Sequence, residues 1–109
     1  AFFIGSLFNK GKRFDNLSEG LNFASTAAKH MDEAGRFIPV EIQRSVIKYG
    51  KGLPDPRGSN ATMYYDVMYK DGKKYNVEVL YDAETNTVYH FKYTDREIRN
   101  GDFVLPATK

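Results

Sequence analysis

The chain has 109 residues, a length that suits one domain with a single hydrophobic core. It contains no cysteine, which excludes a disulfide framework, a thiol nucleophile and cysteine-ligated zinc. Its net charge of +2 permits contact with nucleic acid, although it is smaller than the charge of a strongly basic nucleic-acid-binding domain. No apolar run has the length of a membrane span.

The N-terminal residues 1–14 combine an apolar start with the basic segment NKGKR. We expect them to be a linker or an N-terminal arm, and we expect residues 15–109 to form a single domain. The first residue is Ala rather than Met, so we expect the chain to be a piece of a longer protein.

A first helix is predicted to begin at Asp15 and to end before Gly35. Apolar residues recur there at one-turn spacing, and glycine suits the position just after a helix. Gly20 weakens the helical pattern, so Leu21 is an alternative start.

A second helix is predicted in IPVEIQRSVIKYGKG, residues 38–52. Pro39 suits the first turn of this helix and Gly50 terminates it. The two prolines of GLPDP prevent further helix, so we expect a bent loop that carries Arg57.

After this loop the apolar pattern changes from helical spacing to alternation. Residues 61–69, 74–81 and 88–94 are rich in Tyr, Val, Thr and Phe and are separated by turn residues. This pattern predicts three antiparallel strands. A further short strand is expected in DFVLP, residues 102–106.

The turn KDGK, residues 70–73, allows two registers for the first hairpin. A two-residue loop would pair Asp66 with Val77 and turn a carboxylate toward the apolar face. A three-residue loop, with its glycine in the left-handed conformation, would pair Tyr65 with Val77. Hydrophobic matching favours the three-residue loop, because a slip of one residue moves every side chain to the opposite face. The next turn, DAETN, is expected to end on Asn86 in the left-handed conformation.

The favoured register divides the side chains of the sheet between a core face and a polar face. The core face is expected to carry Met63, Tyr65, Val67, Tyr75, Val77, Val79, Tyr89 and Phe91. The polar face is expected to carry Thr62, Tyr64, Asp66, Glu78, His90 and Lys92. We interpret the polar face as a candidate site for proton transfer and phosphate binding.

Glu78 and His90 are expected to be cross-strand neighbours, and a carboxylate beside an imidazole can serve metal-free RNA cleavage. One group takes the proton of the ribose 2′-OH, and the other protonates the departing 5′-oxygen. Arg57 carries a guanidinium fork that matches phosphate oxygens. We therefore expect Glu78, His90 and Arg57 to be catalytic, without assigning acid and base within the pair.

Four further residues are expected to bind the substrate: Lys92, Tyr64, Thr62 and Tyr93. Lys92 would contact phosphate, and a tyrosine ring can stack on a base. The alternative for all of these side chains is ordinary solubility and cross-strand pairing on a solvent-facing sheet.

The sequence contains no pattern for a metal or a nucleotide cofactor. Its two histidines lie far apart, and HExxH, GxGxxG and GxxxxGK[ST] are all absent. We therefore expect no metal site and no cofactor. The second histidine, His30, falls on the first predicted helix, where we expect it to face solvent or to make a local bond.

The segments AGRFIPVEIQRSVIKYGKGLPDPRGSNATMYY and KKYNVEVLYDAETNTVYHFKY resemble the C-terminal toxin domains of bacterial polymorphic and contact-dependent growth inhibition systems. The resemblance covers residues 24–93, about two thirds of the chain. It implies an α+β fold of the barnase/EndoU/colicin/RelE-like ribonuclease type, in which N-terminal helices pack on one face of a small twisted antiparallel sheet.

The same resemblance implies a ribonuclease toxin that cleaves transfer RNA or another RNA and is neutralised by a cognate immunity protein. It implies secretion or cell-surface delivery as part of a larger protein, action in the cytoplasm of a target cell, and a monomer before the inhibitor binds. It does not identify the catalytic residues, because members of this fold do not share them. The alternatives are a non-catalytic RNA- or protein-binding module, an immunity or adaptor protein, and a deoxyribonuclease.

Overall fold

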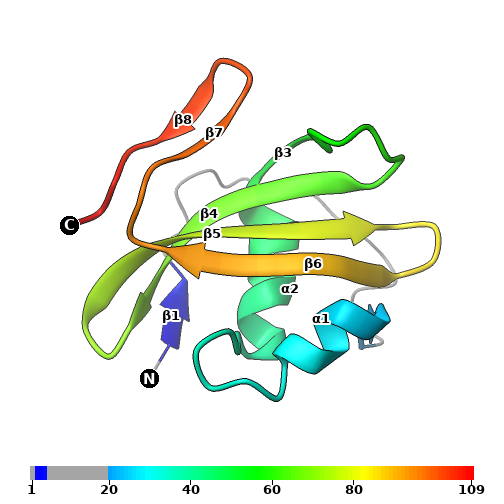
Figure 1. Ribbon diagram of the computed structural model, residues 1–109, viewed down its shortest axis with the longest axis horizontal. Coiled ribbons are helices and arrows are strands. Elements are labelled where there is room, and N and C mark those ends of the chain that lie inside the picture. The colour runs from blue at the N-terminus through cyan, green and yellow to red at the C-terminus, as the bar shows by residue number, and fades with distance from the viewer. Residues whose placement is uncertain (1, 5–19) are drawn as a thin grey trace.

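The computed structural model describes residues 2–4 and 20–109. Two helices lie against a curled, mostly antiparallel sheet, which confirms the expected α+β class (Figure 1). Most of the expected N-terminal arm, and the expected start of the first helix at Asp15, lie outside the described residues.

In the described part of the chain the elements are, in order, β1 (Phe2–Ile4), β2 (Asn22–Phe23), α1 (Ser25–His30), α2 (Val40–Tyr49), β3 (Lys51–Pro54), β4 (Thr62–Lys70), β5 (Lys73–Asp82), β6 (Thr87–Thr94), β7 (Ile98–Asn100) and β8 (Phe103–Leu105). The main sheet has the strand order β1-β4-β5-β6-β2, and β3 also pairs with β4. β2 runs parallel to β6, whereas the other pairs of the main sheet are antiparallel. β7 and β8 form a separate two-stranded sheet.

The second predicted helix is confirmed as α2. Pro39 is its N-cap residue and Gly50 is its C-cap residue, which agrees with the proline and glycine signals in the sequence. Its apolar residues Ile42, Val46 and Ile47 are buried against the sheet.

α1 is shorter than the predicted first helix and has only 6 residues. Two backbone hydrogen bonds tie the segment before α1 to β6 and to the residue that precedes β6. They run from Asn22 N to Asn86 O at 2.9 Å and from Ala24 N to Val88 O at 3.0 Å. Because these amides are already paired with a strand, the segment before α1 does not continue the helix.

The three predicted strands are confirmed as β4, β5 and β6, and Asn86 has the expected left-handed conformation with φ of 53°. The predicted register between β4 and β5 is wrong. Asp71 and Gly72 form a two-residue turn with φ values of 52° and 84°. Asp66 therefore pairs with Val77 and is fully buried, and the predicted core and polar faces of β4 exchange places.

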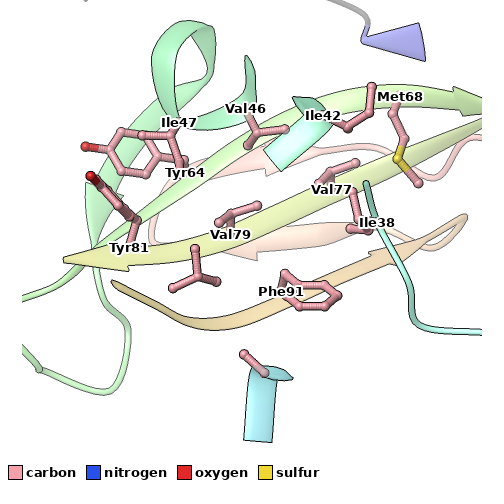
Figure 2. Packing of buried hydrophobic residues seen from close by; sticks show 12 residues of the cluster. Ile38, Ile42, Val46, Ile47, Tyr64, Met68, Val77, Val79, Tyr81 and Phe91 are labelled. Atoms are coloured by element: carbon pink, nitrogen blue, oxygen red, sulfur yellow. The ribbon is translucent and has the colours of Figure 1, made fainter. Parts of the chain in front are cut away.

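The main core lies between the helices and one face of the sheet (Figure 2). Val77 and Phe91 occupy this face as predicted, but β4 contributes Tyr64 in place of the predicted Met63 and Tyr65. The buried residues of this core are Ala27, Ile38, Ile42, Val46, Ile47, Tyr64, Met68, Val77, Val79, Tyr81, Val88 and Phe91.

The opposite face of the sheet is covered in part by the β7–β8 hairpin. Met63 and Tyr65 of β4 pack there with Ile98 of β7 and Leu105 of β8. The predicted strand in residues 102–106 is confirmed as β8, although it pairs with β7 instead of extending the main sheet. β4 is therefore buried on both faces over most of its length.

Two asparagine side chains fix the hairpin to the main sheet. Asn76 of β5 is 1% exposed, and its Nδ2 donates to the carbonyl oxygens of Arg96 at 2.9 Å and Pro106 at 3.0 Å. These two carbonyls lie on either side of the hairpin in the chain. At the far end of β7, Asn100 Nδ2 donates to Pro54 O at 3.0 Å. The hairpin is thus held at its base by β5 and near its tip by β3.

Candidate functional site

A groove with a cavity volume of about 870 Å³ lies on the sheet face opposite α2. Its floor is formed by side chains of the three central strands: Met63, Tyr65, Glu78, Leu80, His90 and Lys92. The loop 55–61 lines one side, and Arg99 of β7 belongs to the same lining. This loop and the β7–β8 hairpin both rise beside the sheet in Figure 1, at opposite ends of its upper edge.

Glu78 of β5 and His90 of β6 lie side by side on the floor of the groove. Glu78 pairs with Lys92, and Leu80 pairs with His90, so Glu78 and His90 are diagonal neighbours on one face of the sheet. His90 Nε2 lies 2.7 Å from Glu78 Oε2. The Glu78 side chain is 13% exposed and the His90 side chain is 36% exposed. The predicted contact between the two is confirmed, and both remain open to a ligand in the groove.

A β-bulge in β6 places an additional side chain beside this pair. His90 is opposite Leu80 while Val88 is opposite Tyr81, so the register shifts by one residue and Tyr89 is the extra residue. Tyr89 is 42% exposed and lines the groove. Its predicted place in the core is therefore wrong, because the bulge turns its ring toward the solvent-facing side.

The loop that carries Arg57 is held by the buried carboxylate of Asp55. Asp55 Oδ1 accepts from Arg57 N at 3.0 Å, and Asp55 Oδ2 accepts from Ser59 Oγ at 2.6 Å and from Ser59 N at 3.3 Å. Ser59 Oγ in turn accepts from Ala61 N at 3.1 Å. The hydrogen bond from the Ser59 hydroxyl, followed by that from the Arg57 amide, holds the pKa of Asp55 below its usual 3.8. The loop is therefore a braced structure that presents Arg57 at the groove.

Three cationic side chains line the groove: Arg57, Lys92 and Arg99. Arg99 is paired with Glu97, whereas Arg57 and Lys92 form no ion pair with any residue in the described ranges 2–4 and 20–109. Three carboxylates also line the groove, and each is already engaged in a hydrogen bond: Asp55, Glu78 and Asp82. A phosphate that enters the groove would therefore meet two cations without an ion pair in the described ranges, beside three carboxylates that each take part in at least one hydrogen bond.

Three residues that were predicted to bind substrate are not among the described residues that line the groove. Tyr64 is buried in the main core, with its ring centroid 6.4 Å from that of Tyr81. Thr62 pairs with Tyr81 and shares the helix-facing side of the sheet. These two placements follow from the two-residue turn, which reverses the faces of β4. The ring of Tyr93 packs against that of Tyr75 at 4.9 Å, beside the same core.

Tyr65 belongs to the groove although the sequence placed it in the core. It is 1% exposed, and its Oη accepts a hydrogen bond from Asn100 Nδ2 at 3.0 Å. Burial raises the pKa of Tyr65, so its hydroxyl keeps its proton and can donate a hydrogen bond. The sequence could have indicated this placement, because the two-residue turn pairs Tyr65 with Glu78 and so puts both side chains on the same face of the sheet. No local signal marks Arg99, because tertiary packing of the hairpin brings it to the groove.

Comparisons with protein-family models, with curated protein sequences and with solved structures found no match for this chain. Among the described residues, no group of three or more His, Cys, Asp or Glu side chains is arranged to hold a metal ion. Neither helix in that part of the chain has the length and apolar character needed to cross a membrane. The groove brings together a carboxylate–imidazole pair, adjoining cations and a partly exposed tyrosine.

Proposed function

We propose that this chain is an endoribonuclease that cleaves RNA without a metal ion, with Glu78 and His90 as its acid–base pair. The observation that carries the proposal is the 2.7 Å contact between these two side chains on the floor of a groove. Arg57 and Lys92 are exposed in the same groove and supply positive charge for a phosphate.

In the proposed reaction, one member of the pair removes the proton from a ribose 2′-OH, and the 2′-oxygen attacks the adjacent phosphorus. The bond between phosphorus and the 5′-oxygen breaks, and the other member donates a proton to that leaving oxygen. The products are a 2′,3′-cyclic phosphate and a 5′-hydroxyl. The Arg57 guanidinium stabilises the negative charge that develops on the phosphate oxygens.

The contact between Glu78 and His90 has to open during this reaction. The attacking and leaving oxygens lie on opposite sides of the phosphorus atom, so two side chains that touch each other cannot reach both oxygens. The His90 side chain is 36% exposed, which gives the ring room to turn away from Glu78 when a phosphate enters. Catalytic hydrogen bonds commonly reach their final geometry only in the substrate complex.

The resemblance to bacterial toxin domains extends this proposal. We propose the barnase/EndoU/colicin/RelE-like ribonuclease type of fold, and transfer RNA or another cellular RNA as the substrate. We also propose a cognate immunity protein as the inhibitor, and delivery as part of a larger protein into the cytoplasm of a target cell. A groove with unpaired cations also suits a non-catalytic module that binds RNA without cleaving it, and turnover separates the two functions.

The test is incubation of the purified protein with total bacterial RNA in excess EDTA, beside the variants His90→Ala and Glu78→Ala. We expect the wild-type protein to produce fragments that end in a 2′,3′-cyclic phosphate. Each variant should cleave more slowly by about 10²- to 10⁴-fold, the usual contribution of a general acid or base.

The chain supplies a matched control in His30. His30 Nδ1 lies 2.7 Å from Glu33 Oε1, the same separation as in the candidate site, but neither residue lines the groove. His30→Ala should retain cleavage. Intact RNA with the wild-type protein would favour the binding module, and cleavage that survives both groove variants would remove Glu78 and His90 from the chemistry.

A further inference from the structure

Arg99 is held beside the groove by the residues on either side of it. Ile98 is buried against the sheet in the small core under the hairpin. Asn100 donates to Pro54 O and to Tyr65 Oη, both at 3.0 Å. With both neighbours fixed, the backbone of Arg99 has a defined position, and Arg99 is one of the residues that line the groove containing Glu78 and His90.

The guanidinium of Arg99 is paired with a neighbouring carboxylate, and both side chains are exposed. Arg99 Nε lies 2.8 Å from Glu97 Oε1, and Arg99 Nη2 lies 3.3 Å from Glu97 Oε2. This is the two-pronged geometry with which arginine also binds a phosphate. The Arg99 side chain is 62% exposed and that of Glu97 is 45% exposed. Because both side chains are exposed, solvent and salt screen this ion pair, and a phosphate that enters the groove can compete with the carboxylate for the guanidinium.

We propose that Arg99 binds a second phosphate of the RNA chain, next to the phosphate that reacts at Glu78 and His90, and that Glu97 occupies the Arg99 fork until RNA arrives. This inference rests on the proposed function, because it takes RNA as the ligand. Arg57 comes from the loop after β3 and Arg99 from β7, so cations from two separate elements line one groove. Such an arrangement suits a polynucleotide with successive phosphates better than a single phosphate group.

The test measures binding and cleavage separately. The binding probe is a short, labelled single-stranded RNA in which every ribose carries a 2′-O-methyl group, so that it has no 2′-OH to react and stays intact. Fluorescence anisotropy gives its Kd as a function of salt concentration for the wild-type protein and for Arg99→Ala, Arg96→Ala and Glu97→Gln. Cleavage is followed with unmodified RNA of the same sequence. Arg96 is a suitable control because it is exposed, lies close to Arg99 in the chain and does not line the groove.

We expect Arg99→Ala to weaken binding by roughly three- to tenfold and to flatten the plot of log Kd against log salt by about 0.7, the value for one phosphate contact on a single strand. Arg96→Ala should change neither quantity, and Glu97→Gln should tighten binding. Equal effects of Arg99→Ala and Arg96→Ala would overturn the site. Weaker binding by Glu97→Gln would overturn the displacement of Glu97. If Arg99→Ala flattens the slope but the wild-type protein does not cleave RNA, the phosphate site is supported and the ribonuclease function is rejected. If the wild-type protein cleaves RNA but Arg99→Ala leaves the slope unchanged, the ribonuclease function is supported and the phosphate site is rejected.

Discussion

The carboxylate of Asp55 organises the loop between β3 and β4 through both of its oxygens. It accepts hydrogen bonds from the Arg57 amide and from the Ser59 amide and hydroxyl. If Arg57 contacts a phosphate as proposed, a loop with this internal bracing would lose little entropy, because its backbone is already ordered. The position of Arg57 therefore depends on the side chain of Asp55.

Replacement of Asp55 should lower stability in a pH-dependent way. The pKa of Asp55 is lower in the folded protein than in the unfolded chain, where it is near 3.8. The ionised carboxylate therefore stabilises the fold fully at pH values above 3.8, and this stabilisation is lost as the pH falls through the folded-state pKa. We expect Asp55→Asn to reduce the free energy of unfolding by about 1–2 kcal/mol at neutral pH. This deficit should shrink as the pH falls below about 4.

Thermal or urea unfolding across this pH range measures the effect of Asp55→Asn. Asp102→Asn serves as the control, because Asp102 is exposed in the turn between β7 and β8. A deficit of the same size at neutral pH and at the acid end would show that the Asp55 carboxylate does not carry the pH dependence.

At the scale of the elements, the turn between β4 and β5 decides which side chains of β4 face the groove. Asp71 and Gly72 both have positive φ, as a two-residue hairpin turn requires. The expected three-residue turn was wrong because hydrophobic matching assumes that only one face of a strand is buried. The β7–β8 hairpin covers the second face of β4, so alternation along β4 no longer distinguishes the core from the outside.

Gly72→Ala should destabilise the protein, because alanine adopts a φ of 84° only with strain. No atom lies within 4 Å of a Cβ added at Gly72, so the loss comes from the backbone alone and should be about 1–2 kcal/mol. Asp71→Asn keeps the favoured residue types of this turn and should change stability by less than about 0.5 kcal/mol. Chemical denaturation of the two variants beside wild type tests this difference, and equal losses would contradict the turn geometry.

Across the whole molecule, the β7–β8 hairpin docks on the sheet face opposite α2 and contributes Arg99 to the lining of the groove. Asn76 is the buried side chain that holds the base of this hairpin, through its bonds to Arg96 O and Pro106 O. Removal of its amide leaves two carbonyl oxygens without that donor. Asn76→Ala should therefore lower the free energy of unfolding by about 2–3 kcal/mol and loosen the hairpin before the rest of the fold.

Amide hydrogen exchange tests this prediction, because exchange of the β7 and β8 amides should accelerate more than that of β5. Asn22→Ala is a control of the same residue type, since Asn22 donates one exposed hydrogen bond to Thr85 O at 3.3 Å. Uniform acceleration across the sheet would show that Asn76 supports the whole fold and not the hairpin alone.

Local signals in the sequence predicted the α+β class, α2, the three long strands and the contact of Glu78 with His90. These features depend on periodicity, capping residues and the pairing of adjacent strands. The strand pairing of β2, the bulge at Tyr89 and the entry of Arg99 into the groove were not predicted. The pairing of β2 and the place of Arg99 depend on the packing of segments that are distant in sequence. The bulge at Tyr89 is a local break in strand pairing. The composition of the sequence near these residues indicates neither the packing nor the bulge.

The docking of β7 and β8 on the main sheet has a consequence for synthesis of the chain. A ribosome releases β4, β5 and β6 before it releases the hairpin, and adjacent antiparallel strands can pair as soon as they emerge. In a nascent chain that has not yet reached Ile98, the apolar side chains of Met63 and Tyr65 lack the partners that bury them in the complete protein. During that interval the incomplete chain exposes apolar side chains at the position where the complete protein has its groove. It also lacks Arg99, so we expect the lining of the groove to be complete only when the final strands have folded over the sheet.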